Sequence, residues 1–148
     1  MYQDTITLFN RVPGGSAGDS FYPTVIKNVN LNIDRAAILA KYGPDSKDSA
    51  VLHIRYQNKN GRIVIVCDSK TDKPWMPPKA WDKTRETVTF NTDGDFFIQG
   101  EWNGGIVSDA DYGPDGFYAK MNREHDYVFA VSSIARYSVI PHFEIMGK

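Results

Sequence analysis

The three histidines are the residues of this chain best suited to bind a transition metal or to transfer a proton near neutral pH. They are His53, His125 and His142, and none of them falls in an H-E-x-x-H pattern or a comparable ligand spacing. A fold could still gather residues that are distant in sequence. Spacing by itself favours structural or surface roles for the three imidazoles, so we predict no metal-binding residues.

The segment from Asp109 to Gly116 resembles the start of a calcium-binding loop, because its carboxylates stand at alternating positions. The resemblance is partial. Lys120 stands where the closing bidentate glutamate belongs, while Gly113 and Pro114 replace a ligand and the required glycine. We therefore interpret this segment as an ordinary acidic turn.

A second acidic group, Asp93, Asp95 and Glu101, flanks a predicted strand and could supply the carboxylate pair of a glycoside hydrolase. Carboxylates beside an Asp-Gly dipeptide more often solvate a turn or a strand edge. The chain has no P-loop, dinucleotide fingerprint or G-x-S-x-G elbow, and its single cysteine, Cys67, follows an apolar run as a small buried hydrophobe would. We predict no catalytic residues, no cofactor and no enzymatic activity.

Three tryptophans, Trp75, Trp81 and Trp102, leave a choice between functions. In a carbohydrate-binding module the rings would be exposed and would stack on sugars. In an assembly subunit they would be buried against a neighbouring protein, because tryptophan is enriched at interface hot spots. In the third interpretation they cover the core of the protein itself.

Length and charge restrict the classes of partner. The chain has 148 residues, which is close to the commonest size of one domain, and its formal net charge of -1 lacks the basic excess of a duplex-binding protein. No apolar run approaches the roughly 18 residues of a membrane span, and the start of the chain lacks the pattern of a signal peptide. We expect one domain over residues 1–148, made in the cytosol, with neither a membrane nor specific nucleic acid as its partner.

Alternation of apolar and polar residues predicts most of the regular elements. An opening hairpin pairs residues 5–9 with residues 21–31 around an exposed glycine-rich tip, and a second hairpin is closed by Asn60-Gly61. Residues 32–43 fit a short helix and a bulged strand almost equally well. The remaining predicted strands cover residues 51–56, 62–66, 86–90, 95–99, 127–135 and 142–146.

Two other segments complete the predicted fold. Three prolines and two tryptophans between Asp68 and Arg85 predict an ordered loop. A short helix is predicted from Pro114 or Asp115 to about His125, with Asp115 favouring its N-terminus. About eight strands and one or two short helices give a mainly β domain, a single antiparallel β-barrel or sandwich with long loops.

The strand sequences resemble those of small head-to-tail joining proteins of tailed phages. D-T-I-T-L-F-N-R from Asp4 and F-Y-P-T-V-I-K-N-V-N-L from Phe21 resemble their first two strands, and G-D-F-F-I-Q-G-E-W from Gly94 is similar to a later one. The end of the chain, from Tyr127, is similar to their closing strands. The whole chain also resembles a prophage-encoded structural family of Gram-positive bacteria, although residues 73–81 and 106–124 depart from the short joining-protein pattern.

This resemblance implies a non-enzymatic structural protein of a phage or prophage particle, and more specifically a head-tail connector or stopper subunit that assembles into a ring. The implied partners are the adaptor, the tail terminator or the tail tube, and further copies of the chain. The implied location is the cytoplasm of the bacterial host during assembly and then the virion. A carbohydrate-binding or minor tail module that uses exposed tryptophans is the alternative. The assembly contacts are expected in the glycine-rich tip and the proline-rich loop, at Gly14, Gly15, Asp19, Trp75, Pro77, Pro78 and Trp81.

Overall fold

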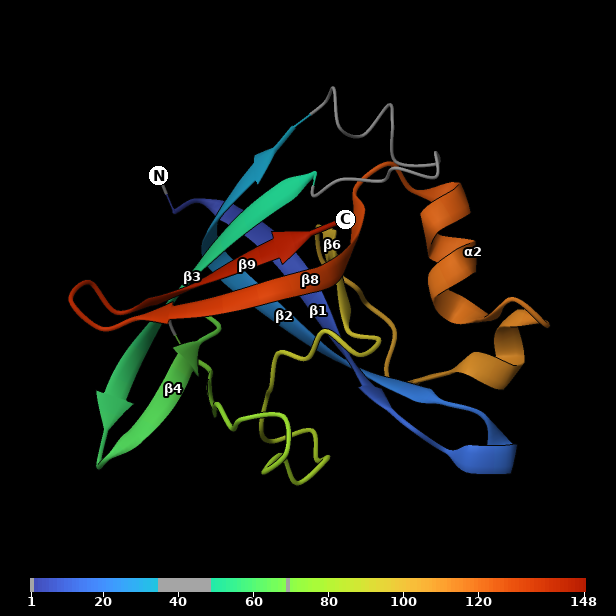
Figure 1. The fold of residues 1–148 in the computed structure, drawn as a ribbon, viewed down its shortest axis with the longest axis horizontal. Coiled ribbons are helices and arrows are strands. Elements are labelled where there is room, and N and C mark those ends of the chain that lie inside the picture. Colours follow the sequence, from blue (N-terminus) through green and yellow to red (C-terminus); the bar gives the residue numbers. More distant parts are fainter. Residues whose placement is uncertain (1, 35–48, 69) are drawn as a thin grey trace.

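Six antiparallel strands close into a barrel in the computed structural model, which describes residues 2–34, 49–68 and 70–148 (Figure 1). Each strand is hydrogen-bonded to the next, and the last one, β6, pairs with β1. Every strand of the ring therefore has a neighbour on both sides, which removes the open edges of a flat sheet. The predicted mainly β fold is confirmed, and it is a barrel. In order around the ring, the strands are β1 (Asp4–Val12), β2 (Ser20–Ile33), β3 (Ala50–Lys59), β9 (His142–Gly147), β8 (Val128–Tyr137) and β6 (Phe96–Gln99).

The barrel interior is filled by apolar side chains at alternate positions of these strands. Leu52 and Ile54 of β3 lie in the same buried cluster as Phe143 and Ile145 of β9. Because successive side chains of a strand point to opposite faces, the residues between them lie on the outer surface of the barrel. His53 is one of these outward-facing residues.

A second apolar cluster lies outside the barrel, where the helix α2 (Gly116–Glu124) packs against it. Phe117 of α2 is completely buried, with its ring centroid 5.2 Å from that of Phe9 and 5.7 Å from that of Phe96. The chain reaches the helix through β7 (Val107–Ser108), which pairs with the start of β2, and the 3-10 helix η2 (Asp109–Tyr112). Burial of the apolar side of this segment anchors it to the barrel wall.

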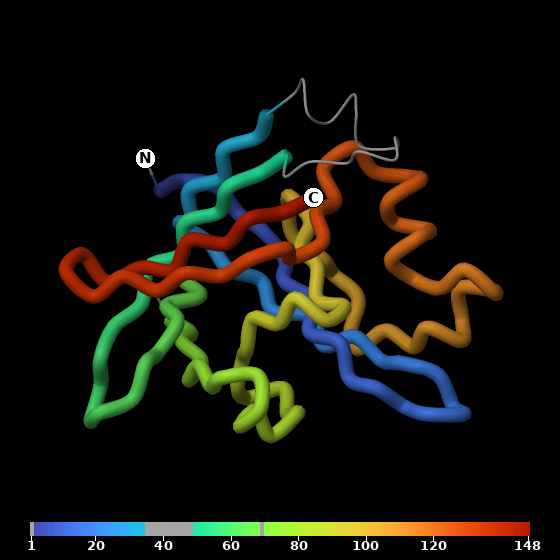
Figure 2. The backbone as a smooth tube through the Cα atoms, viewed as in Figure 1, coloured from blue at the N-terminus to red at the C-terminus, as the bar shows by residue number. Residues whose placement is uncertain are grey.

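Three hairpins extend beyond the barrel in different directions (Figure 2). The β1–β2 hairpin ends in a tip that contains the 3-10 helix η1 (Gly15–Ala17). The β3–β4 hairpin is formed with β4 (Arg62–Val66), and β5 (Asp72–Pro74) adds to the far side of β4. The β8–β9 hairpin turns through residues 138–141. The predicted hairpins at residues 5–31 and 51–66, the helix after Pro114 and the last two strands are all confirmed.

Three sequence-based expectations need correction. The predicted strand at residues 86–90 is wrong, because that segment makes one parallel bridge, Val88 with Trp75, and no ladder. The region predicted as a loop, residues 68–85, contains the short strand β5. The two-residue strand β7 was not predicted, because two residues carry no periodic pattern. Of the undecided segment 32–43, β2 includes the first two residues, and residues 35–43 lie outside the described residues.

Candidate functional site

The tip of the β1–β2 hairpin is exposed, as the sequence predicts. Gly14 and Gly15 both face solvent, and a Cβ atom at Gly14 would lie 1.8 Å from the carbonyl oxygen of Gly18, so the turn closes only around glycine. The Asp19 carboxylate is engaged within the hairpin, where it accepts a hydrogen bond of 2.7 Å from Nε of Arg11. The tip thus presents mainly backbone to a partner, while Asp19 fixes its base.

The buried side chain of Asp95 connects this hairpin to the start of β6 through hydrogen bonds. Its Oδ1 accepts a hydrogen bond of 2.8 Å from the backbone N–H of Arg11, and its Oδ2 accepts hydrogen bonds from Nδ2 of Asn10 at 2.8 Å and from the backbone of Asn91 at 3.0 Å. Burial raises the pKa of Asp95 to about 6, against the effect of these donors. Both oxygens accept hydrogen bonds from the Asn10 side chain or from backbone N–H groups, which gives this carboxylate a structural role.

The proline-rich loop exposes its prolines more than its tryptophans. Pro77 and Pro78 are exposed, whereas Trp81 is 8% exposed and the Trp75 ring packs with its centroid 5.0 Å from that of Phe143. The interpretation in which the tryptophans cover the core of the protein is therefore the one that these two indoles fit. Trp81 exposes little of its side chain, and its expected role as an assembly contact stays a prediction.

Trp102 is also packed against the protein. Its ring centroid lies 5.7 Å from that of Phe9 and 5.5 Å from that of Phe117, and its Nε1 donates a hydrogen bond of 3.3 Å to the carbonyl oxygen of Gly105. The sugar-binding alternative requires indole rings that lie open to solvent. Trp81 is buried and Trp75 and Trp102 are partly buried, so the packing of the three indoles favours the interpretation in which they cover the core.

Among the described residues, the most exposed large apolar side chains lie at the tip of the β8–β9 hairpin, which the sequence analysis did not single out. Val139 is 96% exposed and Ile140 is 71% exposed. Ile140 and Pro141 also line a pocket of about 340 Å³, together with Lys27 and Arg55. The signal was present in the sequence as Ser138-Val-Ile-Pro141, two β-branched apolar residues in the turn between two predicted strands.

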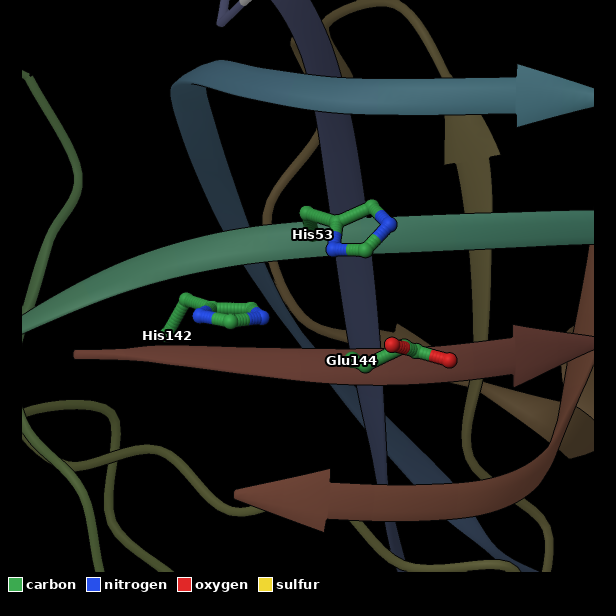
Figure 3. A group of neighbouring side chains, drawn as sticks. All are labelled: His53, His142 and Glu144. Atoms are coloured by element: carbon green, nitrogen blue, oxygen red, sulfur yellow. The ribbon is translucent and has the colours of Figure 1, made fainter. Parts of the chain in front are cut away.

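Two of the three histidines meet on the outer face of the barrel (Figure 3). His53 lies on β3, and His142 and Glu144 lie on the neighbouring strand β9, with one ligand atom of each within 4.8 Å of the others. His125 ends α2 elsewhere and does not belong to this group. The spacing of the histidines along the sequence did not predict this group, because strand pairing brings its members together.

The acidic segment before α2 is used to start the helix. Oδ1 of Asp109 accepts a hydrogen bond of 2.6 Å from the backbone N–H of Phe117, and Asp115 forms an ion pair of 3.2 Å with Arg123. Asp115 occupies the N-cap position without capping the helix through its side chain, so the role expected of it is filled by Asp109. These contacts fit the interpretation of an acidic turn.

The chain belongs to the family described as "Family of unknown function (DUF6751)", whose model matches residues 1–148. Neither a curated protein nor a solved structure matches the chain. No helix within the described residues is long and apolar enough to cross a membrane.

Proposed function

We propose that this DUF6751 protein is a non-enzymatic structural subunit of a tailed-phage or prophage particle, and that it joins its neighbours as a head-tail connector in a ring. The resemblance of its strands to those of head-to-tail joining proteins supports the phage assignment. The projecting β8–β9 tip supports assembly and is the observation that carries it.

The exposed tip has the properties of a segment that is buried on association. Fully burying a valine or isoleucine side chain contributes roughly 1.5–3 kcal/mol, so covering Val139 and Ile140 favours contact with a partner. Tyr56 holds the base of the hairpin, because its hydroxyl donates a hydrogen bond of 2.8 Å to the carbonyl oxygen of Tyr137 and its backbone N–H lies 3.4 Å from the carbonyl oxygen of Pro141. A tip that is already held in place loses little conformational entropy on binding.

The other two exposed contact candidates belong to different segments of the chain. The Gly14–Gly15 tip and the Pro77–Pro78 loop extend from different strands, which suits a subunit that has one neighbour on each side and another ring above or below it. The proposed partners are further copies of the chain and the adaptor, tail terminator or tail tube. The proposed location is the cytoplasm of the host during assembly and the virion afterwards, with no sequence-specific contact to nucleic acid.

Gene deletion and complementation in a phage or prophage that carries the gene test this proposal. We expect the deletion to give heads that lose their DNA or fail to join tails, as seen by electron microscopy. The double variant Val139→Ser, Ile140→Ser should restore few infectious particles, because it removes the apolar tip without touching the barrel.

Ile106→Ser is the matched control, because Ile106 is also an exposed apolar residue but lies in the loop before β7. We expect this variant to complement the deletion fully. Normal, tailed and DNA-filled particles in the deletion strain would overturn the connector role. Full complementation by the double variant would remove the β8–β9 tip from the interface.

A further inference from the structure

His53, His142 and Glu144 are brought together by the register of two barrel strands. In the β3–β9 ladder His53 lies directly opposite Glu144, and Arg55 lies opposite His142. His53, Glu144 and His142 therefore occupy neighbouring positions on one face, while their immediate sequence neighbours fill the barrel. All three side chains are partly buried, so their orientation is restricted and solvent still reaches them.

The imidazole of His142 is set in the orientation and tautomer that a metal ligand needs. Its Nδ1 lies 2.6 Å from the carbonyl oxygen of Ile140, and because a carbonyl only accepts, Nδ1 must carry the proton. In the neutral ring this leaves the lone pair of Nε2 free for a metal. The Tyr137 ring stacks on His142 at 4.9 Å and 13°, which fixes the plane of the imidazole. Histidine ligands in metal sites commonly have such a support for the second nitrogen.

We propose that His53, His142 and Glu144 form a binding site for a divalent transition-metal ion, with zinc as the best fit. Two imidazoles and one carboxylate are a ligand set that Zn²⁺ uses in sites that keep an open fourth position. Mg²⁺ and Ca²⁺ prefer oxygen ligands throughout and would bind this set poorly. The three ligand atoms lie within 4.8 Å of one another. In a tetrahedron with Zn–N bonds of about 2.0–2.1 Å, ligand atoms are roughly 3.4 Å apart, a separation that small rotations of these side chains reach.

The strand on one side of the group presents a small residue to it. Across β8, Ala135 lies opposite Glu144 and contributes only a methyl group on that side. The nearby cation in the ladder, Arg55, places its guanidinium carbon 4.7 Å from the centre of the Tyr2 ring, where its charge is partly balanced by the aromatic face. A water molecule completes the coordination from the solvent side. This inference is independent of the proposed assembly role.

Isothermal titration of the tag-free, chelator-treated full chain with ZnCl₂ tests the site. We expect one saturable zinc site in the wild type and no comparable binding of MgCl₂. His53→Gln and Glu144→Gln should each weaken zinc binding by more than the roughly 10- to 100-fold that loss of an outer-shell partner costs, because each removes a direct ligand. His125→Ala is the matched control, because it removes a histidine outside the group, and it should bind zinc as the wild type does.

Co²⁺ provides a second readout that reports on ligand identity. We expect visible absorption bands typical of tetrahedral coordination in the wild type and in His125→Ala, and their loss in His53→Gln. Circular dichroism of each variant confirms that the barrel is folded, which outward-facing substitutions should leave intact. Absence of a saturable zinc site in the wild type, or equal zinc affinity in His53→Gln and the wild type, would overturn the proposal.

Discussion

The buried carboxylate of Asp95 makes a specific prediction about how the stability of the protein depends on pH. Asp95 is 2% exposed, and burial raises its pKa from the ordinary value of 3.8 to about 6. A raised pKa means that folding favours the protonated form. The resulting contribution to stability is fully present below the pKa of the unfolded chain and is lost as the pH rises through about 6.

The magnitude follows from the difference between the two pKa values. At about 1.4 kcal/mol for each pH unit, the free energy of unfolding should contain a contribution from Asp95 that falls by about 3 kcal/mol between about pH 4 and about pH 7. Asp95→Asn removes this titration. Asp68 and Asp82 have lowered pKa values, caused chiefly by hydrogen bonds from the Lys70 backbone N–H and the Thr87 hydroxyl, and contribute in the opposite direction. Asp68 and Asp82 are present in both the wild type and Asp95→Asn, so their effect cancels when the unfolding free energies of the two proteins are subtracted.

Urea unfolding of the wild type and of Asp95→Asn, followed by circular dichroism from about pH 4 to about pH 8, measures the difference. We expect the unfolding free energy of the wild type minus that of the variant to decrease as the pH rises, with its midpoint between the two pKa values. The size of this difference at any single pH does not test the pKa shift, because the asparagine amide would face the N–H donors of Asn10 and Asn91 and change the stability at every pH. A constant difference over this range, or one that increases with pH, would refute the reasoning.

Three further predictions concern packing and reactivity. Phe117→Ala should lower the unfolding free energy by about 3–5 kcal/mol in urea titrations, because it opens a cavity between α2 and the barrel, and a loss below about 1 kcal/mol would mean that the helix contributes little. Gly147→Ala should cost about 1–3 kcal/mol in the same assay, since its Cβ atom would lie 2.7 Å from Cβ of Phe129; an unchanged midpoint would contradict that close packing. Cys67 is buried and its pKa is raised to about 11, mainly by burial, so a thiol reagent should label it only after unfolding. Rapid labelling of the native protein at neutral pH would contradict this.

Local signals in the sequence predict the hairpins and the helix well. The β3–β4 turn is predictable because Asn60 and Gly61 adopt positive φ angles of 52° and 77°, which that dipeptide accepts at low cost. The segment 86–90 shows where a local pattern fails. Apolar and polar residues do alternate in its sequence, but the residues from Thr87 to Phe90 are all buried. Apart from the single bridge between Val88 and Trp75, the segment pairs with no strand.

Barrel closure and the histidine group could not be predicted from the sequence, for one shared physical reason. Both depend on β9 pairing with β3, a contact between strands that are distant along the chain. The turn signals that predict hairpins concern only consecutive strands and say nothing about such a distant pair. The burial of Trp81 and the partial burial of Trp75 likewise follow from how the loop folds back on the barrel. The composition of that loop is equally compatible with exposed and with buried rings.

The β8–β9 hairpin connects the two proposals through one hydrogen bond. The carbonyl oxygen of Ile140, at the exposed tip, accepts the hydrogen bond from Nδ1 of His142 that leaves Nε2 free for a metal. An ion bound to Nε2 strengthens the preference for the proton on Nδ1 and so holds the tip in the observed conformation. Zinc binding and the contact at Val139 are then coupled, and by linkage the factor by which zinc raises the affinity of the tip for its partner equals the factor by which the partner raises the affinity for zinc. Zinc should therefore protect the backbone N–H groups of the tip from hydrogen exchange in the wild type and not in His53→Gln.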